Sequence, residues 1–91
     1  MKVKYNKSFL SKLEDLLLES NFNLRYEKGN FKSGFCILND KKMVIINKYY
    51  SLEGKVNCLM EIIKQIDLDI SNFTDKSKLL YNSINQTELA F

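Results

Sequence analysis

The sequence predicts an α+β fold with the element order α-β-β-β-α-α, in which a three-stranded antiparallel meander packs against helices. Apolar residues recur at helical spacing before residue 21 and after residue 51, whereas residues 22–27 alternate strictly between apolar and polar. Two further apolar runs flank a short polar turn at 39–42. The chain has 91 residues, of which 45% are hydrophobic, and this favours a single small globular domain over 1–91.

The first helix is expected to begin near Ser8 or Ser11, because Ser11-Lys12-Leu13-Glu14 has the form of a capping box. Asn21 tolerates the left-handed conformation that ends many helices, so we expect the helix to stop there. The apolar face of this helix consists of Phe9, Leu10, Leu13, Leu16 and Leu17.

Three strands are expected to follow the helix. Residues Phe22–Glu27 form the first, and Lys28-Gly29-Asn30 has the composition of a tight hairpin turn. The second strand is expected over Phe31–Leu38 and the third over Met43–Ile46, joined by a turn at Asn39-Asp40. Part of the second strand and part of the third strand are apolar on both faces. These parts need to be covered on both sides of the sheet, by helices or by another subunit.

The last two elements are predicted helices. Ser51 is the expected N-cap of a helix that ends near Ile66 and packs on the sheet. A third helix is expected from Thr74 or Asp75 to Asn85, followed by a frayed tail over 85–91. In the helix that Ser51 caps, the side chains predicted to face inward are Leu52, Val56, Leu59, Met60, Ile62, Ile63 and Ile66. For the last helix, they are Phe73, Leu80, Tyr81 and Ile84.

The charge pattern is mild and mixed. The 14 basic and 11 acidic residues give a net charge of +3, without the clustered basic stripe of a typical nucleic-acid surface. The first residues lack the apolar core of a signal peptide, and nowhere do about 18 apolar residues run together. We therefore expect a soluble cytoplasmic protein with no membrane partner.

The residues available for catalysis are few. The chain has no histidine, and Cys36 and Cys58 lie in apolar patterns without CxxC spacing, so both are expected to be small buried hydrophobes. A thiol nucleophile would lack its usual base. We predict no catalytic residue, no metal site and no cofactor, and we expect that the protein is not an enzyme.

One segment resembles a known family. Val44-Ile45-Ile46-Asn47, a short loop and Ser51–Lys64 resemble the last strand and active-site helix of the ImmA/IrrE-type zinc metallopeptidases, which cleave repressor proteins in bacteria. Met60-Glu61-Ile62-Ile63-Lys64 then takes the place of their HExxH motif, whose two imidazoles bind zinc. Here Met60 and Lys64 replace both imidazoles and only Glu61 matches. The resemblance implies a degenerate, metallopeptidase-like fold that binds peptide without cleaving it.

A second resemblance covers the region of the strands. The segment from Arg25 to Cys36, followed by Met43 to Lys48, resembles a small uncharacterised protein type of the Bacteroidetes. That resemblance implies a cytoplasmic bacterial protein.

Three groups of residues are candidates for an interaction surface. Asn57, Glu61 and Lys64 share one helical face, whose alternative role is a solvated surface. Tyr49 and Tyr50 precede the same helix and either line a contact surface or pack against the helix as staples. Phe31 and Phe35 either stack on single-stranded nucleic acid or belong to the core or a dimer contact.

Three functions remain open from the sequence. The preferred one is a non-enzymatic protein-interaction module whose partner is another protein or a second copy of itself, as a homodimer. The alternatives are a nucleic-acid-associated or regulatory protein that uses dispersed lysines such as Lys41 and Lys42, and the peptide-binding metallopeptidase-like fold.

Overall fold

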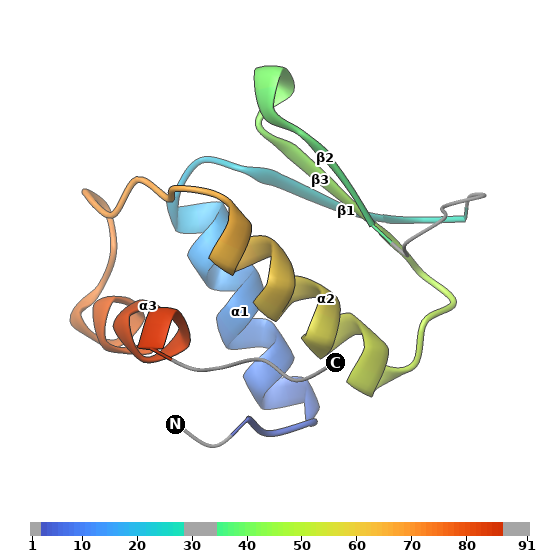
Figure 1. The fold of residues 1–91 in the computed structure, drawn as a ribbon, viewed down its shortest axis with the longest axis horizontal. Helices are drawn as coiled ribbons and strands as arrows, with labels where there is room; N and C mark the ends of the chain where they lie inside the picture. The colour runs from blue at the N-terminus through green and yellow to red at the C-terminus, as the bar shows by residue number, and fades with distance from the viewer. Residues whose placement is uncertain (1–2, 29–34, 87–91) are drawn as a thin grey trace.

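The computed structural model describes residues 3–28 and 35–86 (Figure 1). The first helix, α1, spans Lys7–Glu19 and begins next to Ser8, the earlier of its two predicted starts. Its N-cap is Asn6, whose side-chain oxygen accepts a hydrogen bond from the backbone N–H of Phe9 at 2.7 Å. Asparagine caps a helix as well as serine does, and the earlier start places Phe9 on the buried face. Ser11 therefore lies inside the helix, and the predicted capping box is wrong.

The end of α1 follows the prediction. Asn21 has φ of 65°, in the left-handed region. The backbone N–H of Phe22 bonds to the carbonyl of Leu17 at 2.9 Å, and that of Asn21 bonds to Leu18 at 3.0 Å. This pair of bonds is the Schellman arrangement, which turns the chain directly into the first strand.

The sheet is mixed, so the predicted antiparallel meander is wrong. Strand β1 (Asn23–Glu27) pairs in parallel with β3 (Met43–Asn47), and β2 (Phe35–Leu38) pairs with β3 in antiparallel fashion. The order across the sheet is β1-β3-β2. A 3-10 turn, η1 (Asn39–Lys41), joins β2 to β3 where the sequence predicts a turn.

The apolar pattern explains why β3 is central. Val44 and Ile46 are fully buried, and Met43 and Ile45 are also apolar, so β3 gains most from neighbours on both sides. Strand β1 carries Arg25 and Glu27 between apolar residues, a pattern that suits an edge. The alternation alone does not specify pairing direction, and the predicted turn at Gly29-Asn30 lies outside the described residues.

The two remaining helices follow the sequence closely. Helix α2 spans Leu52–Gln65, and the Ser51 hydroxyl accepts from the backbone N–H of Gly54 at 3.1 Å, as its predicted N-cap role requires. Helix α3 spans Asp75–Gln86, so 85 and 86 are helical rather than part of a tail; residues 87–91 lie outside the described chain.

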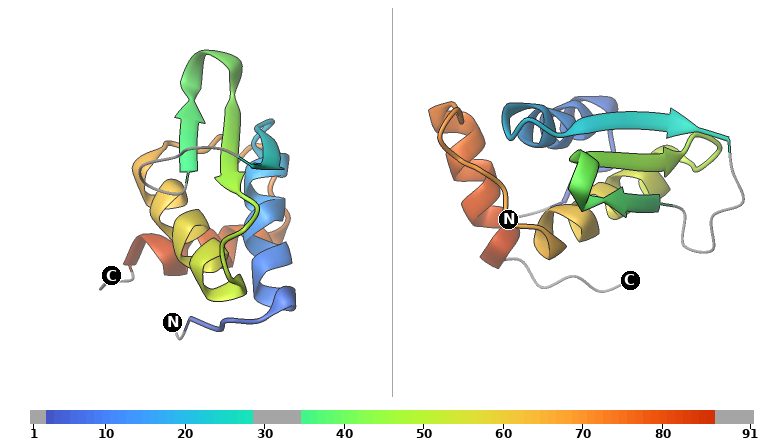
Figure 2. Two further views of the ribbon diagram at one scale, coloured as in Figure 1. Left: turned by 90° about the vertical axis from the view of Figure 1, so that its right-hand side faces the viewer. Right: turned by 90° about the horizontal axis from the view of Figure 1, so that it is seen from above.

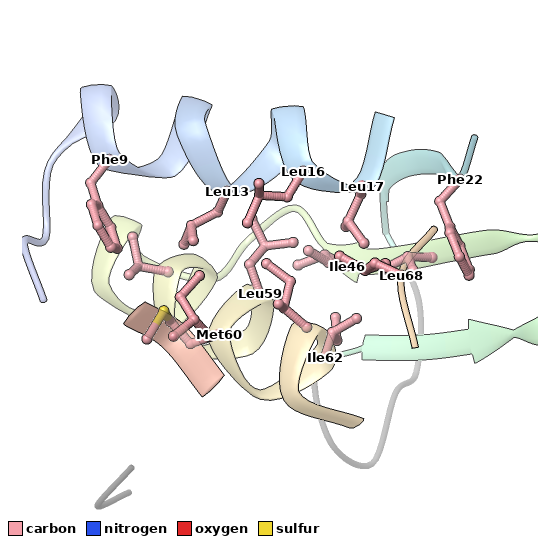
Figure 3. Packing of buried hydrophobic residues seen from close by; sticks show 14 of the residues in the cluster. Phe9, Leu13, Leu16, Leu17, Phe22, Ile46, Leu59, Met60, Ile62 and Leu68 are labelled. Carbon is pink, nitrogen blue, oxygen red and sulfur yellow. The ribbon is translucent and has the colours of Figure 1, made fainter. Parts of the chain in front are cut away.

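The elements form layers (Figures 1 and 2). Helices α1 and α2 lie side by side across one face of the sheet, and α3 packs against both helices. The core lies between the sheet and these helices, as Figure 3 shows for Leu13, Leu16, Ile46 and Leu59. Ile84 of α3 and Phe73, which precedes α3, are both buried in this core, as predicted. The rings of Phe73 and Tyr81 meet edge to face, with their centres 5.7 Å apart. The fold class α+β is confirmed.

Candidate interaction surface

The sheet has one covered face and one face that none of the three helices covers. Side chains alternate along a strand, so the burial of Val44 and Ile46 under the helices directs Met43 and Ile45 to the opposite side. Figure 2 shows α1, α2 and α3 on one side of the sheet only. We call the other side the open face.

The open face has an apolar part and a polar part. Ile45 lies beside Cys36 of β2 and Arg25 of β1, while Met43 lies beside Leu38 and Asn23. The apolar part, which belongs to the β2–β3 hairpin, consists of Cys36, Leu38, Met43 and Ile45, all of intermediate exposure. The polar residues of the open face are Asn23, Arg25, Glu27 and Asn47.

Two of these polar residues form an ion pair. Nε of Arg25 lies 3.6 Å from Oε1 of Glu27, with the side chains 59% and 44% exposed. An exposed pair of this kind contributes about 0–1 kcal/mol to stability. Its importance here is its position, because it places both signs of charge beside the apolar part of the open face.

The two cysteines lie in different environments. Cys58 is buried, as predicted. Its burial, which has the larger effect, and the nearby charge of Glu61 both raise the pKa of its thiol. Cys36 is half-exposed on the open face, so the prediction that both cysteines are buried is wrong for Cys36. The cause is that β2 has helices on one side only.

Phe35 lies on the covered face rather than the open face. Its register partner is Ile46, and its side chain is half-buried against the hydrophobic core. This position corresponds to the predicted core role of Phe35. Phe31 lies outside the described residues.

The two tyrosines before α2 have different surroundings. Tyr49 is 68% exposed, with Nζ of Lys48 at 5.4 Å from its ring centre. The Tyr50 ring lies over the first turn of α2, where a Cβ added to Gly54 would come within 2.9 Å of it. Tyr50 thus packs on the helix in the manner predicted for a staple, while Tyr49 projects outward.

Two residues of the predicted face of α2 form side-chain hydrogen bonds. The Tyr5 hydroxyl donates to Oδ1 of Asn57 at 3.0 Å, and Nε2 of Gln65 donates to Oε1 of Glu61 at 3.4 Å. Lys64 is exposed. These residues share a helical face, but they lie on α2 and the open face belongs to the sheet, so the two are separate surfaces.

A polar cluster on the covered side joins three elements. The Tyr26 hydroxyl of β1 donates a hydrogen bond to the Glu14 carboxylate of α1, and Nζ of Lys55 from α2 lies 5.3 Å from the Tyr26 ring centre. The pKa of Tyr26 is raised, chiefly by burial and next by the hydrogen bond to Glu14 and the negative charge of the Glu14 carboxylate. The cluster fixes β1 against both helices.

Sequence reasoning missed the individual residues of the open face, although it identified the apolar runs that contain them. The missing step was to divide each run by alternation, with Val44 and Ile46 on one side and Met43 and Ile45 on the other. That division requires knowing which face the helices cover. The runs themselves do not contain that information.

Two features are absent from the part of the chain that the structure describes. Among residues 3–28 and 35–86, no group of three or more histidine, cysteine, aspartate or glutamate side chains is arranged to hold a metal ion. Within the same ranges, no helix has the length and apolar character needed to cross a bilayer. Comparisons of the whole chain with protein-family models, curated proteins and solved structures find no match.

Proposed function

We propose that the chain is a non-enzymatic protein-interaction module that associates with a second copy of itself through the open face. The observation that carries the proposal is the apolar part of that face, formed by Cys36, Leu38, Met43 and Ile45. Apolar side chains on a sheet face gain free energy when a second surface removes them from water. A second copy supplies a surface of the same chemistry.

The layout of the open face supports pairing. The apolar hairpin lies on one side and the polar row of β1 lies beside it, with Asn23 level with Met43 and Arg25 level with Ile45. Interfaces commonly place an apolar centre inside a polar rim that remains partly wet. Two such faces, related by a two-fold axis, bring the hairpins together at the centre.

The charges also suit a two-fold arrangement. In a symmetric dimer the same patch must complement itself, so each charge needs an opposite charge within that patch. Arg25 and Glu27 meet this condition, because they carry opposite charges on neighbouring positions of the same edge. With the hairpins together at the centre, β1 of each subunit lies at the rim, where Arg25 and Glu27 neutralise each other within their own subunit.

The size of the surface predicts that the association is weak. With strands about 4.8 Å apart and residues about 3.3 Å apart, the open face measures roughly 10 Å by 17 Å. A standard interface buries about 800 Å² on each partner, which is several times larger. The proposal is therefore a reversible dimer that forms at micromolar or higher concentration.

Sedimentation equilibrium over a range of protein concentrations tests the dimer. The double variant Ile45→Thr with Met43→Thr keeps side chains that strands accept and removes apolar surface, so it is expected to weaken dimerisation by about tenfold or more. Leu18→Gln is the matched control, because Leu18 is 55% exposed on α1, away from the sheet. A wild-type protein that stays monomeric at several hundred micromolar would refute self-association.

A charge exchange tests this placement at the rim. Arg25→Glu alone and Glu27→Arg alone each give β1 two like charges, whereas the double exchange keeps one charge of each sign. With the hairpins at the centre, the double exchange should leave dimerisation unchanged. A double exchange that weakens the dimer as much as Ile45→Thr with Met43→Thr does would overturn the arrangement with the hairpins at the centre.

A further inference from the structure

A hollow of about 620 Å³ lies between α1 and α3, away from the sheet. Its volume is in the range of pockets that hold small organic ligands, about 300–1,000 Å³. We call it the α1–α3 hollow. It is lined by Lys4, Phe9, Lys12, Asp15 and Glu19 from the α1 side and by Thr74, Lys76, Ser77, Leu79 and Leu80 from the α3 side.

Three of the side chains that line the hollow are large and apolar: Phe9, Leu79 and Leu80. Phe9 is buried and Leu80 is half-buried against the core. Leu79, which also lines the hollow, is 70% exposed. A ligand with a hydrocarbon portion would cover Leu79 and contact all three.

The charged groups around the hollow are not equally available. Oε1 of Glu19 accepts from the backbone N–H of Thr74 at 3.1 Å, and Oε2 accepts from the Ser77 hydroxyl at 2.9 Å, so this carboxylate is already engaged. Within residues 3–28 and 35–86, Lys4, Lys12 and Lys76 form no ion pair. The lining therefore has three lysine ammonium groups against the two carboxylates of Asp15 and Glu19, and carries a small net positive charge.

The charges are also separated along α1. Lys12 follows Phe9 by three residues, which places the two side chains side by side on the helix. Glu19 lies seven residues further on, about 10 Å along the axis, a distance at which salt at about 0.1 M screens much of its repulsion. Asp15 lies three residues beyond Lys12 and offsets part of its charge, so an anion is favoured toward Lys4, at the N-terminal end of α1.

From these observations we infer that the α1–α3 hollow binds an amphipathic anion of the alkyl carboxylate class. The hydrocarbon chain lies on Phe9, Leu79 and Leu80, and the carboxylate lies at Lys12 and Lys4. This site is separate from the open face and does not depend on dimerisation.

Calorimetric titration with octanoate, decanoate and octan-1-ol separates the two parts of the ligand. Each added methylene that is buried should tighten binding by about fourfold, so decanoate is expected to bind roughly 15-fold more tightly than octanoate. Octan-1-ol has a chain of the same length without the charge and is expected to bind several-fold more weakly than octanoate. Equal binding of octanoate and octan-1-ol would overturn the role of the lysines.

Two pairs of surface variants locate the site. Lys12→Gln should weaken decanoate binding about fivefold or more, whereas Lys78→Gln, on an exposed α3 lysine outside the lining, should leave it unchanged. Leu79→Ser should reduce the gain from octanoate to decanoate, whereas Leu18→Ser should not. All four positions are exposed, so the variants are expected to fold.

Circular dichroism of each variant verifies folding before titration. If each test variant matches its control, or if folded wild-type protein binds no decanoate at 1 mM, the inference is wrong.

Discussion

The Ser77 hydroxyl, in the first turn of α3, donates a hydrogen bond of 2.9 Å to the Glu19 carboxylate, in the last turn of α1. The same carboxylate accepts from the backbone N–H of Thr74 at 3.1 Å. A helix N-terminus has N–H groups without partners inside the helix and a partial positive charge, and both favour a carboxylate there. Glu19 thus attaches the start of α3 to the end of α1.

Replacement of either residue should loosen α3. Because a hydrogen bond to a charged group contributes about 1.5–3 kcal/mol, we expect Ser77→Ala and Glu19→Ala each to lower the free energy of unfolding by about that amount. Urea denaturation of both single variants and the double variant measures the coupling between them. Additive losses would show that the two side chains act independently, contrary to the geometry.

We predict that the raised pKa of Tyr26 makes the folded protein lose stability at alkaline pH. Its pKa is raised in the folded state, so the folded chain keeps the phenol proton in a pH range where the unfolded chain has released it. The stabilisation is complete below the ordinary pKa of 10.0 and is lost as pH rises above it. Unfolding measured from pH 8 to about 11 should show a shallower decline for Tyr26→Phe than for wild type. Tyr49→Phe, at an exposed ring, is the control, and an equally shallow decline in that variant would contradict the assignment.

The two cysteines should react at different rates with iodoacetamide. Cys36 is half-exposed, whereas Cys58 is buried and has a raised thiol pKa, so the native protein should be alkylated at Cys36 first. Mass spectrometry of peptides after timed alkylation measures both sites, and denatured protein provides the control in which both react. Self-association through the open face further predicts slower alkylation of Cys36 at high protein concentration. Rapid native modification of Cys58 would contradict its burial.

The resemblance to zinc metallopeptidases can be tested by restoring the motif. The double variant Met60→His with Lys64→His recreates two imidazoles at i and i+4 around Glu61. Met60 is only 1% exposed and packs in the core, so we expect this variant to lose about 2–5 kcal/mol and to gain no stability from zinc. Thermal unfolding with and without zinc measures this, and Lys64→His alone is the control. A zinc-dependent rise in melting temperature confined to the double variant would instead support the resemblance.

Local chemistry made the helix boundaries largely predictable. Asn21 ends α1 and Ser51 begins α2 because each acts through its own backbone or side chain within a few residues. The local sequence left the start of α1 open between Ser8 and Ser11. The burial of Phe9 favours the earlier start, which Asn6 caps.

Strand pairing was not predictable in the same way. The alternation in β1 and the apolar run in β3 are compatible with either pairing direction, and the choice depends on how both helices fit on one face of the sheet. The same uncertainty applied to the candidate surface. Phe35 and Cys36 are adjacent in the sequence, but Phe35 packs on the core and Cys36 lies on the open face.

The central position of β3 has a consequence for synthesis on the ribosome. Register partners Asn23 and Met43 are 20 positions apart, so β1 is translated before its partner strand exists. At about 5–20 residues per second, that interval lasts roughly 1–4 s, whereas a hairpin such as β2–β3 closes within microseconds. During this interval the nascent β1 has an unpaired edge that other chains could join. Arg25 and Glu27 place charge on that edge and oppose such aggregation while the protein is still incomplete.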